Sequence, residues 1–345
     1  MNEWIEELSD LTAAGEAVVL VTVAGVRGSG PREPGARMIV TPGETIGTIG
    51  GGQLEYQCTR IAVDMLDGDE IPALRKFPLG ASMGQCCGGV VDMLFEPFVS
   101  GLPEWLRDLR ALHGQRRPAV LVVATDAATK FVVTADEVFG EVADDQPAKL
   151  IDQAREILER RESQVIEGMF FGSVVGSDFN IAVFGAGHVG TAVVNALSGL
   201  DCNIRWIDSR RDVFRSVPRN ARAIEAAEPA LEAAALPPGS CYLVMTHSHP
   251  LDFEICDRIL RRDDAAYCGL IGSMSKRRRF EKRFRQQGLS QAEIDKLVCP
   301  IGVDGISGKK PAEIAIAAAA EVLRAYEQSR QEARDLPDNV RPIRS

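Results

Sequence analysis

The chain has 345 residues, enough for two domains of ordinary size. Hydrophobic residues make up 45% and charged residues 26%, which is typical of a globular protein and argues against a disordered chain, a collagen-like chain or a coiled coil. The formal net charge of −10 disfavours bulk attraction to nucleic acid or to an anionic membrane. The apolar runs are too short to span a bilayer, and the N-terminal segment is acidic, unlike a secretory signal. We therefore expect a cytoplasmic protein with no membrane and no nucleic-acid partner.

The first half of the chain mixes predicted strands and helices. A helix at Glu3–Ala14 is followed by a Val-rich strand at Ala17–Ala24, and a Gly- and Pro-rich loop, Gly25–Gly35, leads to a strand at Arg37–Thr41. The mixture indicates an N-terminal α/β domain over residues 1–175, which ends in the Gly- and Ser-rich stretch Gly172–Asp178. The pattern further predicts helices near Gln53–Leu66, Glu104–Leu112 and Ala148–Arg161, and strands near Leu74–Pro78, Val90–Phe98, Ala119–Ala124, Phe131–Thr134 and Val165–Phe171.

From Phe179 onward the pattern changes to strict β-α-β alternation. Asn180–Phe184 and Asn203–Ile207 are apolar strands on either side of a helical pattern at His188–Leu200. Such alternation implies a doubly wound parallel sheet covered by helices on both faces. The fold class is therefore α/β, with a Rossmann-like domain over residues 176–330 and a flexible tail over residues 331–345. Later strands fit Ala223–Ile224, Cys241–Met245 and Ala266–Ile271, and a long Ala-rich helix begins at Pro311.

The second half contains a GxGxxG motif between a predicted strand and a predicted helix. Its glycines are Gly185, Gly187 and Gly190. The first glycine permits a tight turn, the second lets the backbone approach a phosphate, and the third lets the helix pack closely on the strand. The motif predicts a phosphate-bearing or nucleotide ligand, although glycines at these positions can also serve helix–strand packing alone.

The residues after the next predicted strand leave the identity of that ligand open. Asp208 ends the strand and suits a ribose hydroxyl, as in NAD-binding domains. Arg210 and Arg211 follow at once and suit a phosphate instead. An NAD(P) cofactor therefore stays one alternative.

Three of the four histidines fall near the same predicted edge of the sheet. His188 belongs to the glycine motif, and His247 and His249 directly follow the strand Cys241–Met245. Ligands of open parallel sheets bind outside the carboxyl ends of the strands. The histidines either contact an anionic ligand or a metal there, or belong to a turn that caps the helix beginning near Pro250.

The segment Ser273–Arg285 holds seven Lys and Arg residues in an otherwise acidic protein. The segment follows a predicted strand, so the start of its helix faces the same edge of the sheet. We interpret it either as a solvated basic helix face or as a surface that docks a phosphate or an acidic face of a protein partner.

The N-terminal half contains two loops that suit an anion. Arg27–Arg37 carries three arginines in a Gly- and Pro-rich loop, and Gly47–Gly52 can form a nest of backbone N–H groups at the start of a helix. Either loop alone would be an ordinary tight turn, but the pair predicts a second anion-binding site. The residues that we expect to bind there are Arg32, Gly50, Gly51, Gly52 and Glu55.

The eight cysteines lack the paired CxxC spacing of a structural zinc site, so most are expected to be buried thiols. The exception is Cys86-Cys87, which lies between Gln85 and Gly88-Gly89. Glycine-rich backbone exposes its neighbours, and thiolates are soft metal ligands and sulfur nucleophiles. The pair is therefore expected to hold a soft metal centre, to carry sulfur or to form a vicinal disulfide, unless both residues are ordinary small apolar ones.

Taken together, these segments resemble the XdhC/CoxI family, which are accessory proteins for xanthine dehydrogenase and related molybdenum hydroxylases. The resemblance covers nearly the whole chain. It is carried by GSGPREPGARM, GTIGGGQLE and GQCCGG in the first half, and by VFGAGHVG, WIDSR, VMTHSHPLD, GLIGSMSKRRRF, CPIG and PAEIA in the second.

The resemblance implies a chaperone for molybdenum cofactor (molybdopterin) rather than an enzyme with its own turnover. Such a protein binds and protects the cofactor while a cysteine desulfurase sulfurates it, delivers it to the hydroxylase, and tends to be a homodimer. The expected site lies between the two domains. Cys86 and Cys87 are expected near molybdenum or the incoming sulfur, and Gly50–Gly52, or Gly185–Gly190 with Arg210, are expected to receive the phosphate.

Two other functions fit parts of the sequence. An NAD(P)-dependent oxidoreductase would use the GxGxxG glycines and Asp208, but it leaves Cys86-Cys87 without a role. A redox-sensing nucleotide-binding module would use the vicinal thiols as a switch.

Overall fold

The computed structural model describes residues 3–66, 71–79, 88–99, 101–142 and 146–335, and the chain divides into two compact units. Unit 1 is Met1–Gly176 and unit 2 is Ser177–Ser345. Each unit has its own sheets, helices and hydrophobic core. Among the described residues, no helix is both long enough and apolar enough to cross a membrane.

Unit 1 is built from two antiparallel five-stranded sheets. The first has the order β3-β2-β1-β5-β4 and the second the order β8-β7-β6-β10-β9. The strands of the first sheet are β1 (Val18–Arg27), β2 (Arg37–Val40), β3 (Thr45–Gly47), β4 (Ala73–Pro78) and β5 (Val90–Phe98). Those of the second are β6 (Ala119–Ala124), β7 (Lys130–Val133), β8 (Val138–Phe139), β9 (Gln164–Ile166) and β10 (Met169–Val174). The helices are α1 (Glu3–Ala13), α2 (Gly52–Met65), α3 (Glu104–Gly114) and α4 (Pro147–Arg160).

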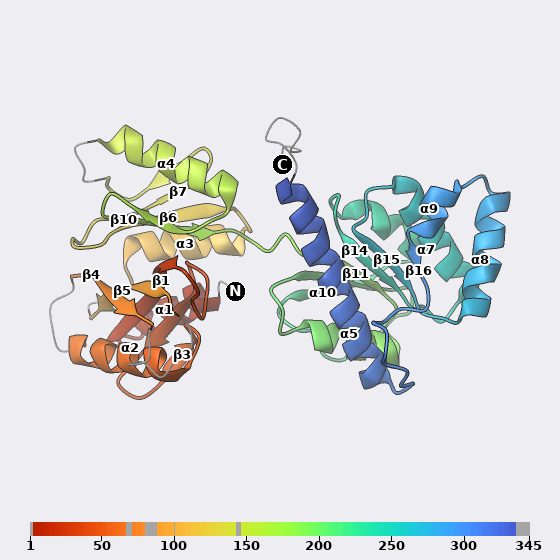
Figure 1. The fold of residues 1–345 in the computed structure, drawn as a ribbon, viewed down its shortest axis with the longest axis horizontal. Helices are drawn as coiled ribbons and strands as arrows, with labels where there is room; N and C mark the ends of the chain where they lie inside the picture. The colour runs from red at the N-terminus through yellow and green to blue at the C-terminus, as the bar shows by residue number, and fades with distance from the viewer. Residues whose placement is uncertain (1–2, 67–70, 80–87, 100, 143–145, 336–345) are drawn as a thin grey trace. The chain divides into compact units, whose positions relative to one another are not determined.

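The helices and sheets of unit 1 alternate in layers (Figure 1). Helix α2 covers one face of the first sheet, α1 and α3 lie between the two sheets, and α4 covers the far face of the second sheet. The central strands β1 and β6 are therefore covered on both faces. Their near-continuous apolar runs, VVLVTVA in β1 and AVLVVA in β6, are buried throughout.

The end of unit 1 differs from the prediction. The expected single strand Val165–Phe171 is wrong, because β9 and β10 form a hairpin in which Ile166 pairs with Met169. The two residues of its turn, Glu167 and Gly168, have φ angles of 49° and 81°. Two consecutive positive φ angles are those of a two-residue hairpin turn, and glycine at the second position makes the turn favourable.

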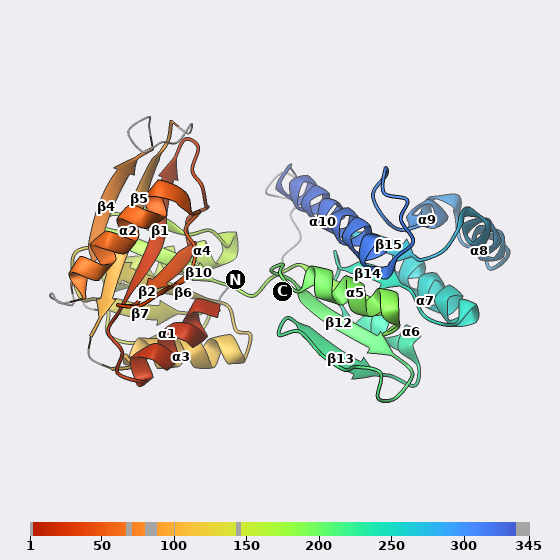
Figure 2. The same ribbon diagram turned by 90° about the horizontal axis from the view of Figure 1, so that it is seen from below.

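Unit 2 is a six-stranded parallel sheet in the order β13-β12-β11-β14-β15-β16. In chain order this is 3-2-1-4-5-6, the doubly wound arrangement of Rossmann folds, so the predicted fold class is confirmed. Figure 2 shows β13, β12, β14 and β15 of this sheet. The strands are β11 (Asn180–Phe184), β12 (Asn203–Asp208), β13 (Ala221–Glu225), β14 (Cys241–Val244), β15 (Tyr267–Leu270) and β16 (Leu297–Val298). The helices are α5 (His188–Leu197), α6 (Pro229–Glu232), α7 (His249–Arg262), α8 (Met274–Gln286), α9 (Gln291–Asp295) and α10 (Pro311–Asp335), with a 3₁₀ turn at Ala233–Ala235.

The side chains of β11 show how the two faces of this sheet are covered. Ile181 and Val183 face a core shared with α5 and α10, whereas Ala182 and Phe184 face a core shared with α7 and α8. This alternation follows from the two-residue period of a strand. Helix α10 runs to Asp335, so residues 331–335 of the predicted flexible tail belong to this helix, and residues 336–345 lie outside the described residues.

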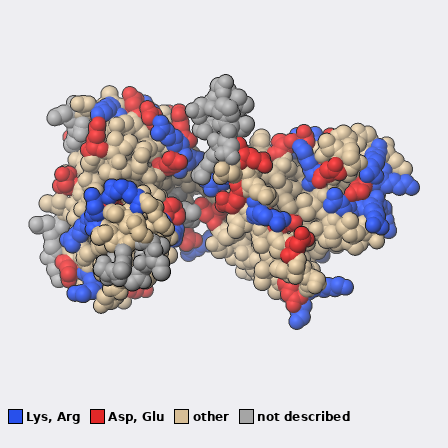
Figure 3. Space-filling view, in the orientation of Figure 1, with Lys and Arg blue, Asp and Glu red and all other residues tan. Residues whose placement is uncertain are grey.

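Charge is divided unevenly between the units. Residues 1–176 contain 15 Lys and Arg against 27 Asp and Glu, whereas residues 177–345 contain 24 against 22. The net negative charge of the chain therefore belongs to unit 1. In unit 2, Lys and Arg side chains gather along the edge formed by α8 (Figure 3).

Candidate functional site

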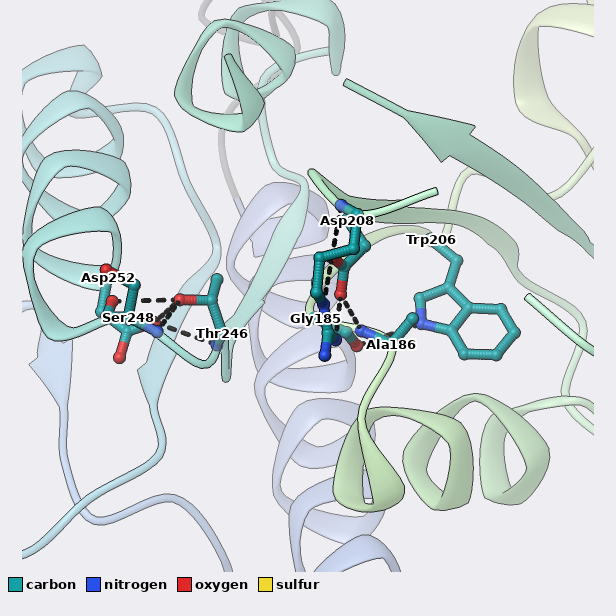
Figure 4. A network of polar contacts seen from close by, with 8 residues as sticks. Gly185, Ala186, Trp206, Asp208, Thr246, Ser248 and Asp252 are labelled. Atoms are coloured by element: carbon teal, nitrogen blue, oxygen red, sulfur yellow. Dashed lines mark hydrogen bonds and ion pairs between the residues drawn. The ribbon is translucent and has the colours of Figure 1, made fainter. Parts of the chain in front are cut away.

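The strand order of unit 2 locates its candidate site. The chain leaves β11 toward β12 on one side and returns to β14 on the other, so the order reverses between β11 and β14. Open parallel sheets bind ligands at such a switch point, outside the carboxyl ends of the strands. The loops that follow these two strands carry Gly185–His188 and Thr246–His249, and Figure 4 shows their polar contacts.

The three motif glycines have different surroundings. Gly185 has a φ of 117°, and a Cβ there would overlap the carbonyl group of Met245. A Cβ on Gly190 would overlap the carbonyl oxygen of Gly185. Both glycines are therefore required by packing within the protein.

Gly187 is different, because a Cβ added there would meet no atom within 4 Å. It is exposed, its φ of −80° suits any residue, and it is the N-cap of α5 without a side chain to cap the helix. The protein itself gives no steric reason for glycine at this position. The open backbone at a helix N-terminus is what a bound phosphate requires.

Asp208, at the end of β12, is engaged within the protein. Its carboxylate accepts hydrogen bonds from the backbone N–H of Ala186 at 2.7 Å and, in a two-pronged contact, from Arg210 Nε at 3.0 Å and Nη2 at 2.8 Å. Burial alone raises the pKa of Asp208, but these hydrogen bonds lower it to about 2. A ribose diol would have to displace Arg210 to reach this carboxylate, so Asp208 and Arg210 are not both free for a ligand.

Asp252 organises the loop after β14. Its Oδ1 accepts hydrogen bonds from the backbone N–H of Thr246 at 3.0 Å and from Thr246 Oγ1 at 2.7 Å. Its Oδ2 lies 2.7 Å from Lys276 Nζ, which also donates to the carbonyl of Ile271 at 2.8 Å. No motif in the sequence marks this buried pair. The available signal was an acid one turn into α7 and a lysine one turn into α8.

The three histidines near this loop lie at the surface of the unit. His188, His247 and His249 are exposed, and Ser248 rather than a histidine caps α7 through the N–H of Leu251. In the part of the chain that the structure describes, no three His, Cys, Asp or Glu side chains are grouped to hold a metal ion. The geometry suits contacts of single histidines with a polar ligand.

In unit 1, the two predicted loops lie against each other. A Cβ on Gly50 would overlap Pro31, and Arg32 Nη1 lies 3.5 Å from the carbonyl oxygen of Thr48. Arg32 also contacts Glu33 at 3.1 Å. The structure therefore brings Arg32 and the Gly47–Gly52 turn together, as the sequence predicted for this pair of loops.

The nest in this turn is filled by the chain itself. Glu55 Oε2 accepts hydrogen bonds from Thr48 Oγ1 at 2.6 Å and from the backbone N–H groups of Ile49 and Gly51 at 3.0 and 3.1 Å. Burial raises the pKa of Glu55, but these donors outweigh it and lower the pKa. The expectation that the nest and Glu55 together bind an external anion needs correction, because Glu55 supplies the anion.

The other two arginines of the first loop are used elsewhere. Arg27 forms an ion pair with Asp92 at 3.2 Å. Arg37 is buried beside the ring of Trp4, 4.2 Å from the ring centroid, and burial lowers its pKa to about 10 despite the attraction of Glu96. Arg32 is thus the arginine of the three that lies at the turn.

Gln85, Cys86 and Cys87 lie outside the described residues, but both ends of their segment are described. Leu79 donates a hydrogen bond to the carbonyl of Gly89 at 2.7 Å, which closes the β4–β5 hairpin. Gly89 packs so closely on Ser29 that a Cβ would overlap the carbonyl oxygen of Ser29. Of the described residues next to this segment, Gly89 therefore lies beside the loop that carries Arg32. The six described cysteines are all free and buried, as expected: Cys58, Cys202, Cys241, Cys256, Cys268 and Cys299.

Comparison with known proteins gives matches to both units. The model of the XdhC Rossmann domain matches residues 181–322, and that of the XdhC and CoxI family matches residues 11–77. The uncharacterized protein YqeB of Escherichia coli (strain K12) is 26% identical over 198 residues, which are 51% of this chain and 36% of YqeB, so this chain spans about a third of the length of that relative.

A solved structure extends the likeness of the fold. The crystal structure of a xanthine dehydrogenase from Bacillus halodurans has a TM-score of 0.72 and 24% sequence identity to this chain, and the match covers 96% of this chain and 98% of that one. At this identity the match shows that the two chains share a fold over nearly their whole length.

Proposed function

Because this chain belongs to the XdhC and CoxI family, we propose that it is an accessory protein for a xanthine dehydrogenase or a related molybdenum hydroxylase. In this proposal it binds and protects molybdenum cofactor, supports its sulfuration by a cysteine desulfurase and delivers it to the hydroxylase. It acts as a homodimer and has no turnover of its own.

Gly187 is the observation that carries the cofactor part of the proposal. It is exposed, free of internal contacts at the Cβ position and placed at the N-terminus of α5, at the switch point of the sheet. Molybdenum cofactor carries a phosphate, and helix N-termini with open backbone bind phosphate. The nest at Gly50–Gly52 is a weaker candidate for that phosphate, because Glu55 already occupies its donors.

Other residues near Gly187 fit the remaining parts of the group. Exposed His188, His247 and His249 offer donors and acceptors to the polar edges of a pterin. Arg210 is partly exposed and can turn some of its N–H groups toward an anion. Cys86 and Cys87, with Gln85, are proposed on family resemblance to lie near molybdenum, where thiolates are suitable soft ligands.

The test uses a substitution that the fold tolerates. Gly187→Ala adds a methyl group that touches nothing in the protein, and Gly199→Ala is the matched control, since Gly199 also has an open Cβ position in unit 2. Each purified chain is incubated anaerobically with released cofactor and desalted, and molybdenum per chain is counted by elemental mass spectrometry. We expect near-stoichiometric molybdenum in the wild type and the control, and at least a tenfold loss in Gly187→Ala, which should lose less than about 1 kcal/mol of stability from its poorer N-cap.

Two results would count against this proposal. Equal molybdenum in all three chains would show that the phosphate does not bind at Gly187. No molybdenum in the wild type would show that the chain does not bind the cofactor. Cys86→Ala and Cys87→Ala form a separate arm. Wild-type retention in both would contradict the thiol contact but not the phosphate site.

An NAD(P)-dependent oxidoreductase is the second candidate, favoured by the 3-2-1-4-5-6 strand order and by Asp208 at the end of β12. The nucleotide ribose would then replace Arg210 on Asp208. Calorimetric titration of the full chain with NADH and with NADPH tests this function. Binding in the micromolar range that Gly187→Ala weakens, together with no retention of molybdenum, would favour the oxidoreductase.

A further inference from the structure

Helix α8 carries seven Lys and Arg residues and one acidic residue, Glu281, within Met274–Gln286. The cations that face neighbouring elements have partners. Lys276 pairs with Asp252 at 2.7 Å, and Arg277 pairs with Glu281 at 2.8 Å. Arg285 donates to Gln291 at 3.1 Å.

Four further cations on α8 are exposed, and within the described residues none of them lies at ion-pair distance from a carboxylate. We call them the α8 cation stripe, and they are Arg278, Arg279, Lys282 and Arg283. Their spacing of i, i+1, i+4 and i+5 places them on one face of the helix. Like charges four residues apart repel, so the stripe destabilises the isolated helix, and packing must hold it in place.

Buried aromatic side chains pack beneath the stripe. Phe280 and Phe284 are buried, and Phe284 stacks on Phe253 with the ring centroids 4.5 Å apart. The Arg283 guanidinium lies 3.9 Å from the centroid of Phe253, which fixes one end of the stripe. The start of the helix is capped by Ser273, whose side chain accepts from the N–H of Lys276. Packing and capping therefore hold the helix that carries the stripe, and Arg283 is the member of the stripe that lies against an aromatic ring.

We propose that the α8 cation stripe docks an acidic surface of another protein. It extends over about 7–8 Å of helix, at 1.5 Å per residue, which is longer than one phosphate requires. Both phenylalanines of α8 are buried, so no aromatic ring on this helix is available to stack on a base, as sites for single-stranded nucleic acid use. The proposal does not depend on which ligand binds at Gly187.

The experiment measures binding of the full chain to immobilised poly-L-glutamate by biolayer interferometry at 50 and 300 mM NaCl. The test variant is R278E/R279E/K282E. The control is R222E/K309E/K310E, which changes the net charge equally at exposed positions of unit 2 away from α8. We expect wild type and control to bind with affinities within twofold of each other at 50 mM and more weakly at 300 mM. The test variant is expected to bind at least tenfold more weakly at 50 mM, with an unchanged melting temperature.

Each other result overturns the proposal. If binding to poly-L-glutamate is weakened equally in both variants, it depends on the net charge of the chain and not on the stripe. If the wild type does not bind, the stripe is not a docking surface for acidic proteins. Tighter binding of the wild type to immobilised polyuridylate than to poly-L-glutamate would show that the stripe binds nucleic acid. A salt-sensitive dimer in sedimentation equilibrium that only R278E/R279E/K282E abolishes would show that the stripe binds a second copy of the chain.

Discussion

The Asp252 carboxylate and the Lys276 ammonium form an ion pair of 2.7 Å that links α7 to α8 at the carboxyl ends of β14 and β15. Asp252 is fully buried, and the side chain of Lys276 is only 10% exposed. Because the same carboxylate holds Thr246, the pair connects the basic helix to the loop with His247 and His249. A change in α8 can therefore alter the geometry of the candidate site.

Breaking this pair should be costly. Asp252→Asn or Lys276→Met leaves one buried charge without its partner, so we expect a loss of about 3–5 kcal/mol in the free energy of unfolding. The exposed pair of Lys296 and Asp263, at 2.5 Å, provides the control, and Lys296→Met should cost less than about 1 kcal/mol. Urea unfolding followed by circular dichroism measures all three. Similar values for Lys276→Met and Lys296→Met would show that burial does not strengthen the first pair.

Removing Glu55 should convert its nest into an anion site. In Glu55→Ala the N–H groups of Ile49 and Gly51 lose their acceptor, so we expect sulfate to raise the melting temperature of this variant by about 2–5 °C more than that of the wild type. Glu44→Ala, at an exposed position in the same unit, should respond like the wild type. An equal sulfate effect in all three chains would mean that the nest is not what binds the anion.

The stability that Glu55 contributes should also depend on pH. Its pKa is lowered in the folded protein, so its contribution is present above the ordinary glutamate pKa of about 4.3 and is lost as the pH falls below that value. The difference in unfolding free energy between wild type and Glu55→Gln should therefore shrink between pH 6 and pH 3. A difference that stays constant over this range would contradict the lowered pKa.

The stability that Asp208 contributes should also fall as the pH falls, but over a wider pH range than for Glu55. Its stabilisation is complete above about pH 4 and is lost as the pH falls toward its folded pKa of about 2. Because Arg210 is partly exposed, we expect Asp208→Asn to cost only about 1 kcal/mol at pH 7. Calorimetric melting of both chains at pH 7 and pH 3 tests this, and a larger loss at pH 3 than at pH 7 would reverse the assigned sign.

The glycine motif yields a stability prediction that separates its members. Gly190→Ala places a Cβ against the carbonyl oxygen of Gly185, a backbone atom that cannot move aside, so we expect a loss of at least about 2 kcal/mol. In urea unfolding, Gly187→Ala should cost less than about 1 kcal/mol, because it loses only the preference of an N-cap for glycine over alanine. Equal losses in the two variants would mean that Gly187 also has a packing role.

Much of unit 2 was predictable because its signals are local. Apolar runs of strand length, a glycine at each turn that needs one and β-α-β alternation together fix a doubly wound sheet, and β11 begins and ends at the predicted residues. The two sheets of unit 1 depend on pairing between distant strands, such as β6 with β10, and periodicity within one strand carries no information on its partner. The Glu167-Gly168 turn was missed because both flanking strands are apolar and read as one run.

The sequence predicted where the residues of the candidate site lie in the fold better than it predicted which groups they contact. Gly187 and the histidines lie where the sequence placed them, at the carboxyl edge of the sheet. The roles of Glu55 and Asp208 were not predictable in the same way, because whether a carboxylate meets a ligand or its own backbone depends on distances of a few ångströms. A residue type next to a glycine-rich turn indicates which groups can bind there, but not whether a ligand or the protein's own side chain fills the turn.

Trp206 gives unit 2 its own optical reporter. The chain has three tryptophans, and Trp4 and Trp105 both belong to unit 1. The buried indole of Trp206 donates a hydrogen bond of 3.1 Å to the carbonyl of Gly185, the first glycine of the motif. Any ligand that shifts this loop will change the surroundings of the indole. In a chain with Trp4 and Trp105 replaced by Phe, the emission wavelength will therefore report whether a ligand has reached the Rossmann unit, whatever the ligand is.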